Sequence, residues 1–354
     1  MSGDLGAAKA AGVESSVAAG DRLASRRMSF RLIDVPGLGW LSNVMAHPSS
    51  GESDLNDAGL DEYFRLGGNC LHLHGEGGEV DSRRAAGYWL DRHRLRSRFF
   101  LCTQICHDGW DPQAQQAIDR FSPEAVAEDV ANDLELLGTN YLDLVYLDDR
   151  PQSPPEPVIQ AVAREIRLGH VRAWGVRNWT PERIHSAAAC ITREAWPEIT
   201  AIITTELALP AATGPLWPEY VPFDAGLRQV VATLRLTVFA HAGDLNTGQC
   251  LYGDEDTTAR ARRHWLDRWQ HPANPAVVQR VRRFAATHGA SPRAVNIAWM
   301  LNQPFPSFAV IALPSFLSSQ RAEYERASQW RLSAADLDSL CGGPGTTDQP
   351  QSSE

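Results

Sequence analysis

Two carboxylates, Asp148 and Asp149, come directly after the largely apolar run Leu142–Leu147. Such a run is typical of a parallel strand that is buried on both faces. In parallel α/β folds the chemistry takes place at the carboxyl ends of the strands. A solvated loop cap is the alternative for an isolated Asp-Asp pair, so a functional role for Asp148 depends on its expected neighbours.

Two histidines supply the first of these neighbours. His72 and His74 lie two residues apart in the predicted strand Cys70–His74, so their side chains leave the same face. Imidazole titrates near neutral pH, and a nearby carboxylate orients it. We therefore predict that His72 and Asp148 form a general acid/base pair and that His74 contacts the substrate or hydrogen-bonds the next loop. The His-x-His spacing also occurs in metal sites, but it is a weak signal here and we expect no metal.

Further polar residues occur at the ends of other predicted strands. The candidates for contacting a substrate are Gln104, Arg177 and His241. Arg177 or Gln104 could stabilise an enolate or a carboxylate in the way that oxyanion donors do. His47 and Glu206 end two more strands, and we expect a structural hydrogen-bonding role for Glu206.

The elements that must position these residues alternate between strand-like and helix-like runs. The predicted strands are Leu41–Ala46, Cys70–His74, Phe99–Ile105, Leu142–Leu147, Ala173–Val176, Ala201–Glu206, Thr237–Ala240 and Phe308–Leu313. Helix starts are marked by a capping hydroxyl before a proline at Ser122, Thr180 and Ser291. Eight strands interleaved with helices predict a (β/α)8 TIM barrel. An open doubly wound sheet is the alternative, weakened because no Gly-x-Gly-x-x-Gly follows the first strand.

Length and composition place further limits on the protein. The chain has 354 residues and is 43% hydrophobic, which is ample for the core of one large domain or two ordinary ones. We expect a single barrel over residues 29–341, a flexible leader over 1–28, a disordered tail over 342–354 and a lid or mobile loop over 245–274.

Charge and cysteine content indicate the partners and the compartment. A net charge of −10 argues against a nucleic-acid partner, and no apolar run approaches the length of a membrane span. The six cysteines show no disulfide framework, and the N-terminal residues lack the apolar block of a signal peptide. We expect a cytoplasmic protein with a small-molecule substrate; the sequence does not indicate an oligomeric state.

Four spaced blocks resemble signatures of the aldo-keto reductase superfamily. They are Gly68–Leu71, Asp133–Leu144, Gly169–Asn178 and Ser291–Pro304, and the resemblance extends from about Arg31 to Leu340. It implies a (β/α)8 barrel that binds NADPH in an extended form. It also implies a catalytic tetrad of an aspartate, a tyrosine acid, a lysine that lowers the pKa of the tyrosine, and a histidine.

The four tetrad positions carry other residues in this chain. They fall on His72, Gly77, Gln104 and Asp148. Glycine cannot donate a proton, and glutamine has no charge with which to tune one. The sequence therefore predicts a divergent member that lacks the family's carbonyl-reduction machinery.

The positions that the resemblance assigns to the cofactor are also changed. The Ser-Asn pair that grips the nicotinamide amide is Arg177-Asn178, and a glutamine on the sixth strand aligns with Thr204. The stacking aromatic falls within 239–241. Ser315 and Gln320 keep the residue types of the phosphate grip, but its basic groups are missing, and each lost charge-assisted bond is worth roughly 1.5–3 kcal/mol. Asn178, Ser315 and Gln320 are thus the candidate NADPH contacts, and binding of NADPH stays open.

Three functions remain compatible with this pattern. The first is a redox-neutral reaction, such as dehydration, isomerisation, epimerisation or cyclisation, on a small-molecule biosynthetic intermediate, carried out by His72 and Asp148. The second is a noncatalytic role in which the barrel binds a ligand or a partner. The third is an NADPH-dependent reduction with an altered proton donor, which could be His72 itself.

Overall fold

The computed structural model describes residues 29–48, 53–73, 80–111, 113, 115–215, 217, 220–243, 247–248, 251 and 267–342. The expected leader, most of the expected tail and most of the segment 245–274 lie outside these residues. His74 and Gly77, to which the sequence assigned a substrate contact and the tyrosine position, also lie outside them.

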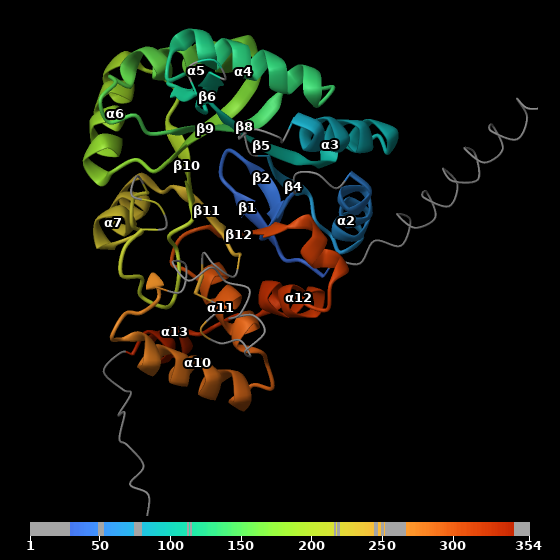
Figure 1. Ribbon diagram of the computed structural model, residues 1–354, viewed down its shortest axis with the longest axis vertical. Coiled ribbons are helices and arrows are strands. Elements are labelled where there is room, and N and C mark those ends of the chain that lie inside the picture. The colour runs from blue at the N-terminus through green and yellow to red at the C-terminus, as the bar shows by residue number, and fades with distance from the viewer. Residues whose placement is uncertain are drawn as a thin grey trace, which may run out of the picture.

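Eight parallel strands form a closed barrel (Figure 1). The strands are β3 (Val44–His47), β4 (Cys70–Leu73), β5 (Phe100–Ile105), β8 (Leu142–Asp148), β9 (Val171–Arg177), β10 (Ile199–Thr204), β11 (Thr237–His241) and β12 (Ser307–Ala312). The barrel closes where β12 pairs with β3. The predicted (β/α)8 barrel is confirmed, and the open-sheet alternative is wrong.

The helices lie around the outside of the strands (Figure 1). They are α2 (Ser53–Arg65), α3 (Val80–Arg92), α4 (Pro123–Leu136), α5 (Glu156–Leu168), α6 (Pro181–Glu194), α7 (Ala225–Leu234), α10 (Asn274–Thr287), α11 (Pro292–Leu301), α12 (Arg321–Gln329) and α13 (Ala334–Cys341). The hydroxyls of Ser122, Thr180 and Ser291 each cap a helix with proline in its first turn, as predicted. Over the described parts of the chain, none of these helices is long and apolar enough to cross a bilayer.

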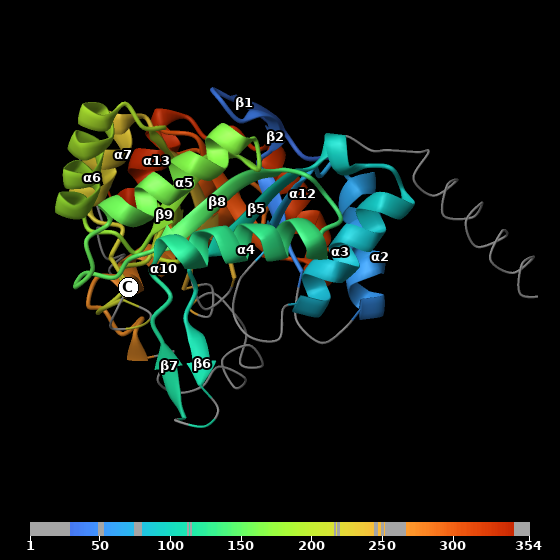
Figure 2. The same cartoon turned by 90° about the horizontal axis from the view of Figure 1, so that it is seen from above.

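Two short hairpins were not predicted. β1 (Leu32–Val35) pairs with β2 (Gly39–Ser42), and Val35 and Leu41 pack against the residues inside the barrel. β6 (Gly109–Asp111) pairs with β7 (Gln116–Ile118) in the connection from β5 to α4. Figure 2 shows the two hairpins at opposite ends of the barrel. The first hairpin therefore closes the amino-terminal end, and the other end is left for a site.

Most strands differ from their predicted bounds by one or two residues, and two of the differences are described here. The predicted strand Leu41–Ala46 is divided between β2 and β3, because the chain turns between the hairpin and the barrel. The sixth barrel strand ends at Thr204, so Glu206 lies two residues beyond it rather than at its end.

Alternation along each strand decides which residues face the interior. Cys70, Cys102, Tyr146 and Phe239 belong to one buried cluster inside the barrel. Their strand neighbours, such as Leu71, face the helices in a separate cluster. Because side chains alternate between faces, the next inward position toward the carboxyl end of each strand belongs to the mouth of the barrel.

Candidate functional site

The inward positions at the carboxyl ends of six strands are polar. On each strand the site residue lies an even number of positions after a residue of the interior cluster, two on five strands and four on β9. The site residues are His47, His72, Gln104, Asp148, Arg177 and His241. Strand register places Asp148 directly opposite Arg177, whereas His72 is opposite Cys102 and Gln104 is opposite Tyr146. The structure therefore brings five of the six predicted catalytic and substrate-contacting residues to one end of the barrel; the sixth, His74, lies outside the described residues.

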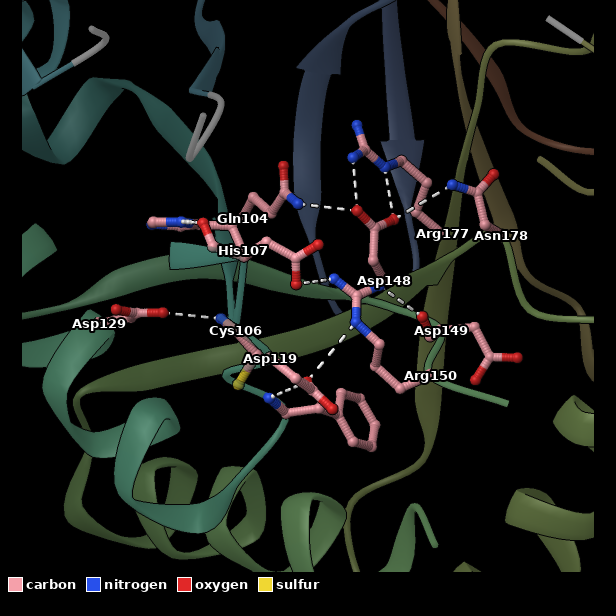
Figure 3. A network of polar contacts seen from close by, with 12 residues as sticks. Gln104, Cys106, His107, Asp119, Asp129, Asp148, Asp149, Arg150, Arg177 and Asn178 are labelled. Atoms are coloured by element: carbon pink, nitrogen blue, oxygen red, sulfur yellow. Dashed lines mark hydrogen bonds and ion pairs between the residues drawn. The ribbon is translucent and has the colours of Figure 1, made fainter. Parts of the chain in front are cut away.

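Asp148 is the centre of one half of this layer. Arg177 donates from Nε to Oδ1 at 2.6 Å and from Nη2 to Oδ2 at 2.5 Å. Gln104 Nε2 donates to Oδ2 at 2.8 Å, and Asn178 Nδ2 donates to Oδ1 at 3.3 Å. Figure 3 shows the carboxylate between these three side chains. Because four donors point at its two oxygens, Asp148 has the contacts of an ionised carboxylate, which only accepts hydrogen bonds.

The Asp148–Arg177 pair is held away from water. The exposed fraction of the side chain is 4% for Arg177 and 14% for Asp148. Burial alone would lower the pKa of Arg177, but the charge of Asp148 outweighs it and raises that pKa above its ordinary value. Asn178 completes the pair from a left-handed backbone conformation (φ 60°), which asparagine tolerates better than most residues.

The other half of the layer is a cluster of imidazole rings. The ring of His72 meets that of His241 edge-on, with centroids 4.9 Å apart and an interplanar angle of 89°. The ring of His47 lies 6.0 Å from that of His72 and 6.2 Å from that of His241. His47 Nδ1 lies 3.1 Å from the carbonyl oxygen of His72. Since a carbonyl can only accept, this nitrogen carries a proton and leaves Nε2 of neutral His47 as an acceptor.

Two of these histidines are held in the neutral form. Burial lowers the pKa of His47 and is only partly offset by its bond to the backbone of His72. The pKa of His241 is held well below its usual range, first by burial, and then by the charge that His47 carries when protonated and by the charge of Arg177. At neutral pH both rings are therefore uncharged.

Tyr146 connects the two halves, and the sequence analysis did not single it out. Its ring stacks on that of His72, with centroids 5.3 Å apart and an angle of 18°. Its hydroxyl donates to Gln104 Oε1 at 3.4 Å, and its ring lies 5.7 Å from the guanidinium carbon of Arg177. The sequence could have identified Tyr146 from its position two residues before Asp148, because that spacing puts both side chains on one face of a strand.

Asp149, the second carboxylate of the pair, has a different environment. Arg183 Nε lies 2.9 Å from its Oδ1, and this arginine also donates to the carbonyl oxygens of Arg150 and Ser153. These contacts tie the end of β8 to the first turn of α6. Asp149 is thus a structural neighbour of the site.

The described residues at the positions that bind the nicotinamide in the family do not fit NADPH. Asn178 donates to Asp148, and the neighbouring Arg177 occupies the place of the family's serine. The hydroxyl of Thr204 accepts from the backbone N–H of Glu206 at 2.9 Å. Phe239 is fully buried against Phe308 below the mouth, so it offers no face for a nicotinamide ring to stack on.

The residues at the positions that bind the 2′-phosphate in the family do not fit NADPH either. Gln320 Oε1 accepts from the hydroxyl of Tyr324 at 2.9 Å. The adjacent Arg321 is paired with Glu62 and Glu325, and Arg293 is paired with Glu323. Ser315 lies in a short 3-10 helix (Leu313–Leu317) and supplies no charge. A 2′-phosphate would have to displace these partners, so the candidate contacts Ser315 and Gln320 do not amount to a phosphate site.

The chain also lacks the lysine that the family's proton donor requires. Its single lysine is Lys9, which precedes the described residues. No lysine is therefore present from residue 10 onward to lower the pKa of a tyrosine in the barrel. Within the described ranges, no group of three or more His, Cys, Asp or Glu residues is arranged to hold a metal ion.

Comparison with known proteins agrees with this fold. The model of the Aldo/keto reductase family matches residues 62–204, from α2 to the end of β10. The chain is also similar to the protein named "Aldo-keto reductase str7" from Strobilurus tenacellus, with 27% identity over 257 residues. This match covers 69% of the present chain and 66% of the relative. Together with the closed eight-stranded barrel, these matches support the resemblance of the chain to the aldo-keto reductase superfamily.

Proposed function

We propose that this protein is an enzyme that catalyses a redox-neutral proton transfer on a small molecule, such as an isomerisation, epimerisation, dehydration or cyclisation. One observation carries the proposal. An imidazole cluster and a fixed carboxylate–guanidinium pair occupy the barrel layer in which the family places its catalytic tetrad. Both halves are built from polar side chains that contact one another, which is unlike a site that has lost its function.

His72 is the group that moves the proton in this proposal. Its ring is held from one side by Tyr146 and from another by His241, so its orientation is fixed before a substrate binds. A positioned imidazole can take a proton from a carbon or oxygen acid and return it elsewhere on the same molecule. The reaction then needs no oxidant or reductant.

Asp148 acts through its neighbours and its charge. Both of its oxygens already accept hydrogen bonds, so it is poorly placed to abstract a proton itself. It fixes Gln104 and Arg177, whose donors can stabilise an oxyanion that develops on the substrate. Its negative charge holds the guanidinium of Arg177 in place.

An NADPH-dependent reduction is the second candidate. The name of the relative from Strobilurus tenacellus favours it, because that protein is called an aldo-keto reductase. His72 would then be the proton donor. The contacts at Asn178, Thr204 and Gln320 oppose this candidate, since each side chain is committed to a protein partner.

Hydrogen exchange distinguishes these candidates without knowledge of the natural substrate. The purified protein is incubated in D2O with a panel of enolisable aldehydes, ketones and hydroxy acids, without nicotinamide, and deuterium incorporation is followed by NMR and mass spectrometry. The proposal expects exchange into at least one compound above the rate of a heat-inactivated control. No exchange, together with NADPH oxidation on the same panel, would favour the reductase. Neither activity would favour a binding role.

A further inference from the structure

Arg268 is a buried cation that its protein partners satisfy only in part. Its side chain is 6% exposed, and Nη2 donates to Glu206 Oε2 at 2.6 Å. The ring of Trp269 lies 4.7 Å from its guanidinium carbon. Nε and Nη1 are both buried and have no hydrogen-bond partner among the residues that the structure describes. By contrast Arg177, which is buried to a similar extent, uses two nitrogens on Asp148.

The position of this guanidinium is the mouth of the barrel. Glu206 follows the carboxyl end of β10, and Arg268 reaches it from the segment before α10. β10 lies between β9, which ends at Arg177, and β11, which ends at His241. The unsatisfied nitrogens of Arg268 are thus close to the strand ends that carry the candidate site.

Surrounding hydrogen bonds fix the backbone that carries this side chain and also bind its partner Glu206. The backbone oxygen of Arg268 accepts from the N–H of Thr213 at 2.8 Å and from its hydroxyl at 3.1 Å. Asn274 donates to the carbonyl oxygens of Trp269 and Ala211, both at 2.8 Å. Glu206 also accepts from the hydroxyl of Thr205 at 3.0 Å. The guanidinium is therefore preorganised in a partly dry environment.

Buried guanidinium donors rarely stay unmatched, and the groups that match them best are anionic oxygens. A carboxylate or a phosphate can accept two parallel bonds from one guanidinium, which is the geometry that distinguishes arginine from lysine. Unpaired donors at a site that binds a ligand are consistent with an acceptor that the ligand brings.

We propose that Arg268 binds an anionic oxygen group, a carboxylate or a phosphate, of the substrate at the mouth of the barrel. This assignment rests on the proposed function in one respect, which is that the anionic group belongs to the substrate. Glu206 orients the guanidinium through Nη2, while Nε and Nη1 face the ligand. The proposal narrows the substrate class to small molecules that carry an acidic group in addition to the centre that reacts near His72.

Anion binding tests this assignment directly. Isothermal titration of the full-length protein with succinate and, separately, with inorganic phosphate is carried out at constant ionic strength, with sodium chloride as the third arm. We expect saturable binding of one of the two oxyanions. Binding should weaken at least tenfold in Arg268→Gln. It should weaken less in Arg268→Lys, which keeps the positive charge but cannot donate two parallel hydrogen bonds. Arg193→Gln, at a side chain that is 68% exposed, is the matched control and should bind like the wild type.

A second variant changes the affinity in the opposite direction. Glu206→Gln removes the competing negative charge while Arg268 is retained, so the oxyanion should bind several-fold more tightly. This variant keeps the test decisive if Arg268→Gln does not fold, as checked by circular dichroism. Absence of saturable binding by the wild type, or equal binding by wild type, Arg268→Gln and Glu206→Gln, would overturn the proposal. His72→Gln should still bind the anion, so failure of the acid/base proposal would be seen separately.

Discussion

Asp148 and Arg177 are register partners on neighbouring strands, and two nitrogens of the guanidinium bond to the two oxygens of the carboxylate. In the family pattern these two positions belong to a catalytic histidine and to a serine that grips the nicotinamide. Here the two positions form a single ion pair. The pair neutralises itself, and it occupies the part of the mouth that the nicotinamide amide would need.

The stability of this pair gives the first prediction. Arg177→Met leaves the carboxylate of Asp148 in a poorly solvated position, and breaking a buried pair in this way costs about 3 kcal/mol or more. The double variant Asp148→Leu with Arg177→Met should recover most of that loss. Urea denaturation measures the free energy of unfolding of the wild type, the single variant and the double variant. A loss well below about 1 kcal/mol in Arg177→Met would show that the pair is not effectively buried.

The two adjacent carboxylates should behave differently on substitution. Asp148→Asn loses the charge that fixes Arg177, so we expect deuterium exchange to fall by at least tenfold. Asp149→Asn weakens the tie to Arg183 instead, with a loss in the free energy of unfolding of about 1–3 kcal/mol and little change in exchange rate. Exchange rates and urea midpoints are measured on both variants. The opposite assignment, with Asp149→Asn inactive and Asp148→Asn active, would contradict the site.

The neutral histidines make stability depend on pH in a defined direction. The pKa values of His47 and His241 are lowered in the folded protein relative to an ordinary value of 6.5, so the unfolded chain binds more protons. The stability that they contribute is present above pH 6.5 and is lost as the pH falls below it. The slope is at most about 1.4 kcal/mol per pH unit for each histidine. Urea unfolding across this range should show a shallower slope for His241→Asn than for the wild type; equal slopes would mean that His241 is not buried in the neutral form.

Cofactor binding provides a further prediction. Titration with NADPH, followed by tryptophan fluorescence and by calorimetry, should show no saturable binding in the micromolar range, because the phosphate end carries paired arginines. Arg321→Ala should leave this result unchanged. Micromolar binding by the wild type would instead support the reductase candidate.

The sequence predicted the barrel because its signals are local. Alternating runs and the capped helix starts at Ser122, Thr180 and Ser291 do not depend on distant contacts. The short hairpins were missed because strands of three or four residues carry almost no periodic pattern. The strand ends were predicted well enough to place His72, Gln104, Asp148, Arg177 and His241 at one end.

The contacts within the site were harder to predict. That Asp148 bonds to Arg177 depends on the register between β8 and β9, which the sequence does not specify. Tyr146 was not assigned to the site because an aromatic residue within an apolar run usually packs in the hydrophobic core. Arg268 reaches Glu206 across 62 residues, and no local pattern connects the two.

The central claim is that this barrel moves protons with His72 and needs no nicotinamide. The most direct measurement compares deuterium exchange, without added cofactor, in wild type, His72→Gln and the control His170→Gln, whose side chain is 42% exposed, on the panel compound that exchanges fastest. We predict a loss of at least about a hundredfold in His72→Gln with an unchanged circular dichroism spectrum, and no loss in His170→Gln. Exchange that persists in His72→Gln, or that appears only when NADPH is added, would contradict the account.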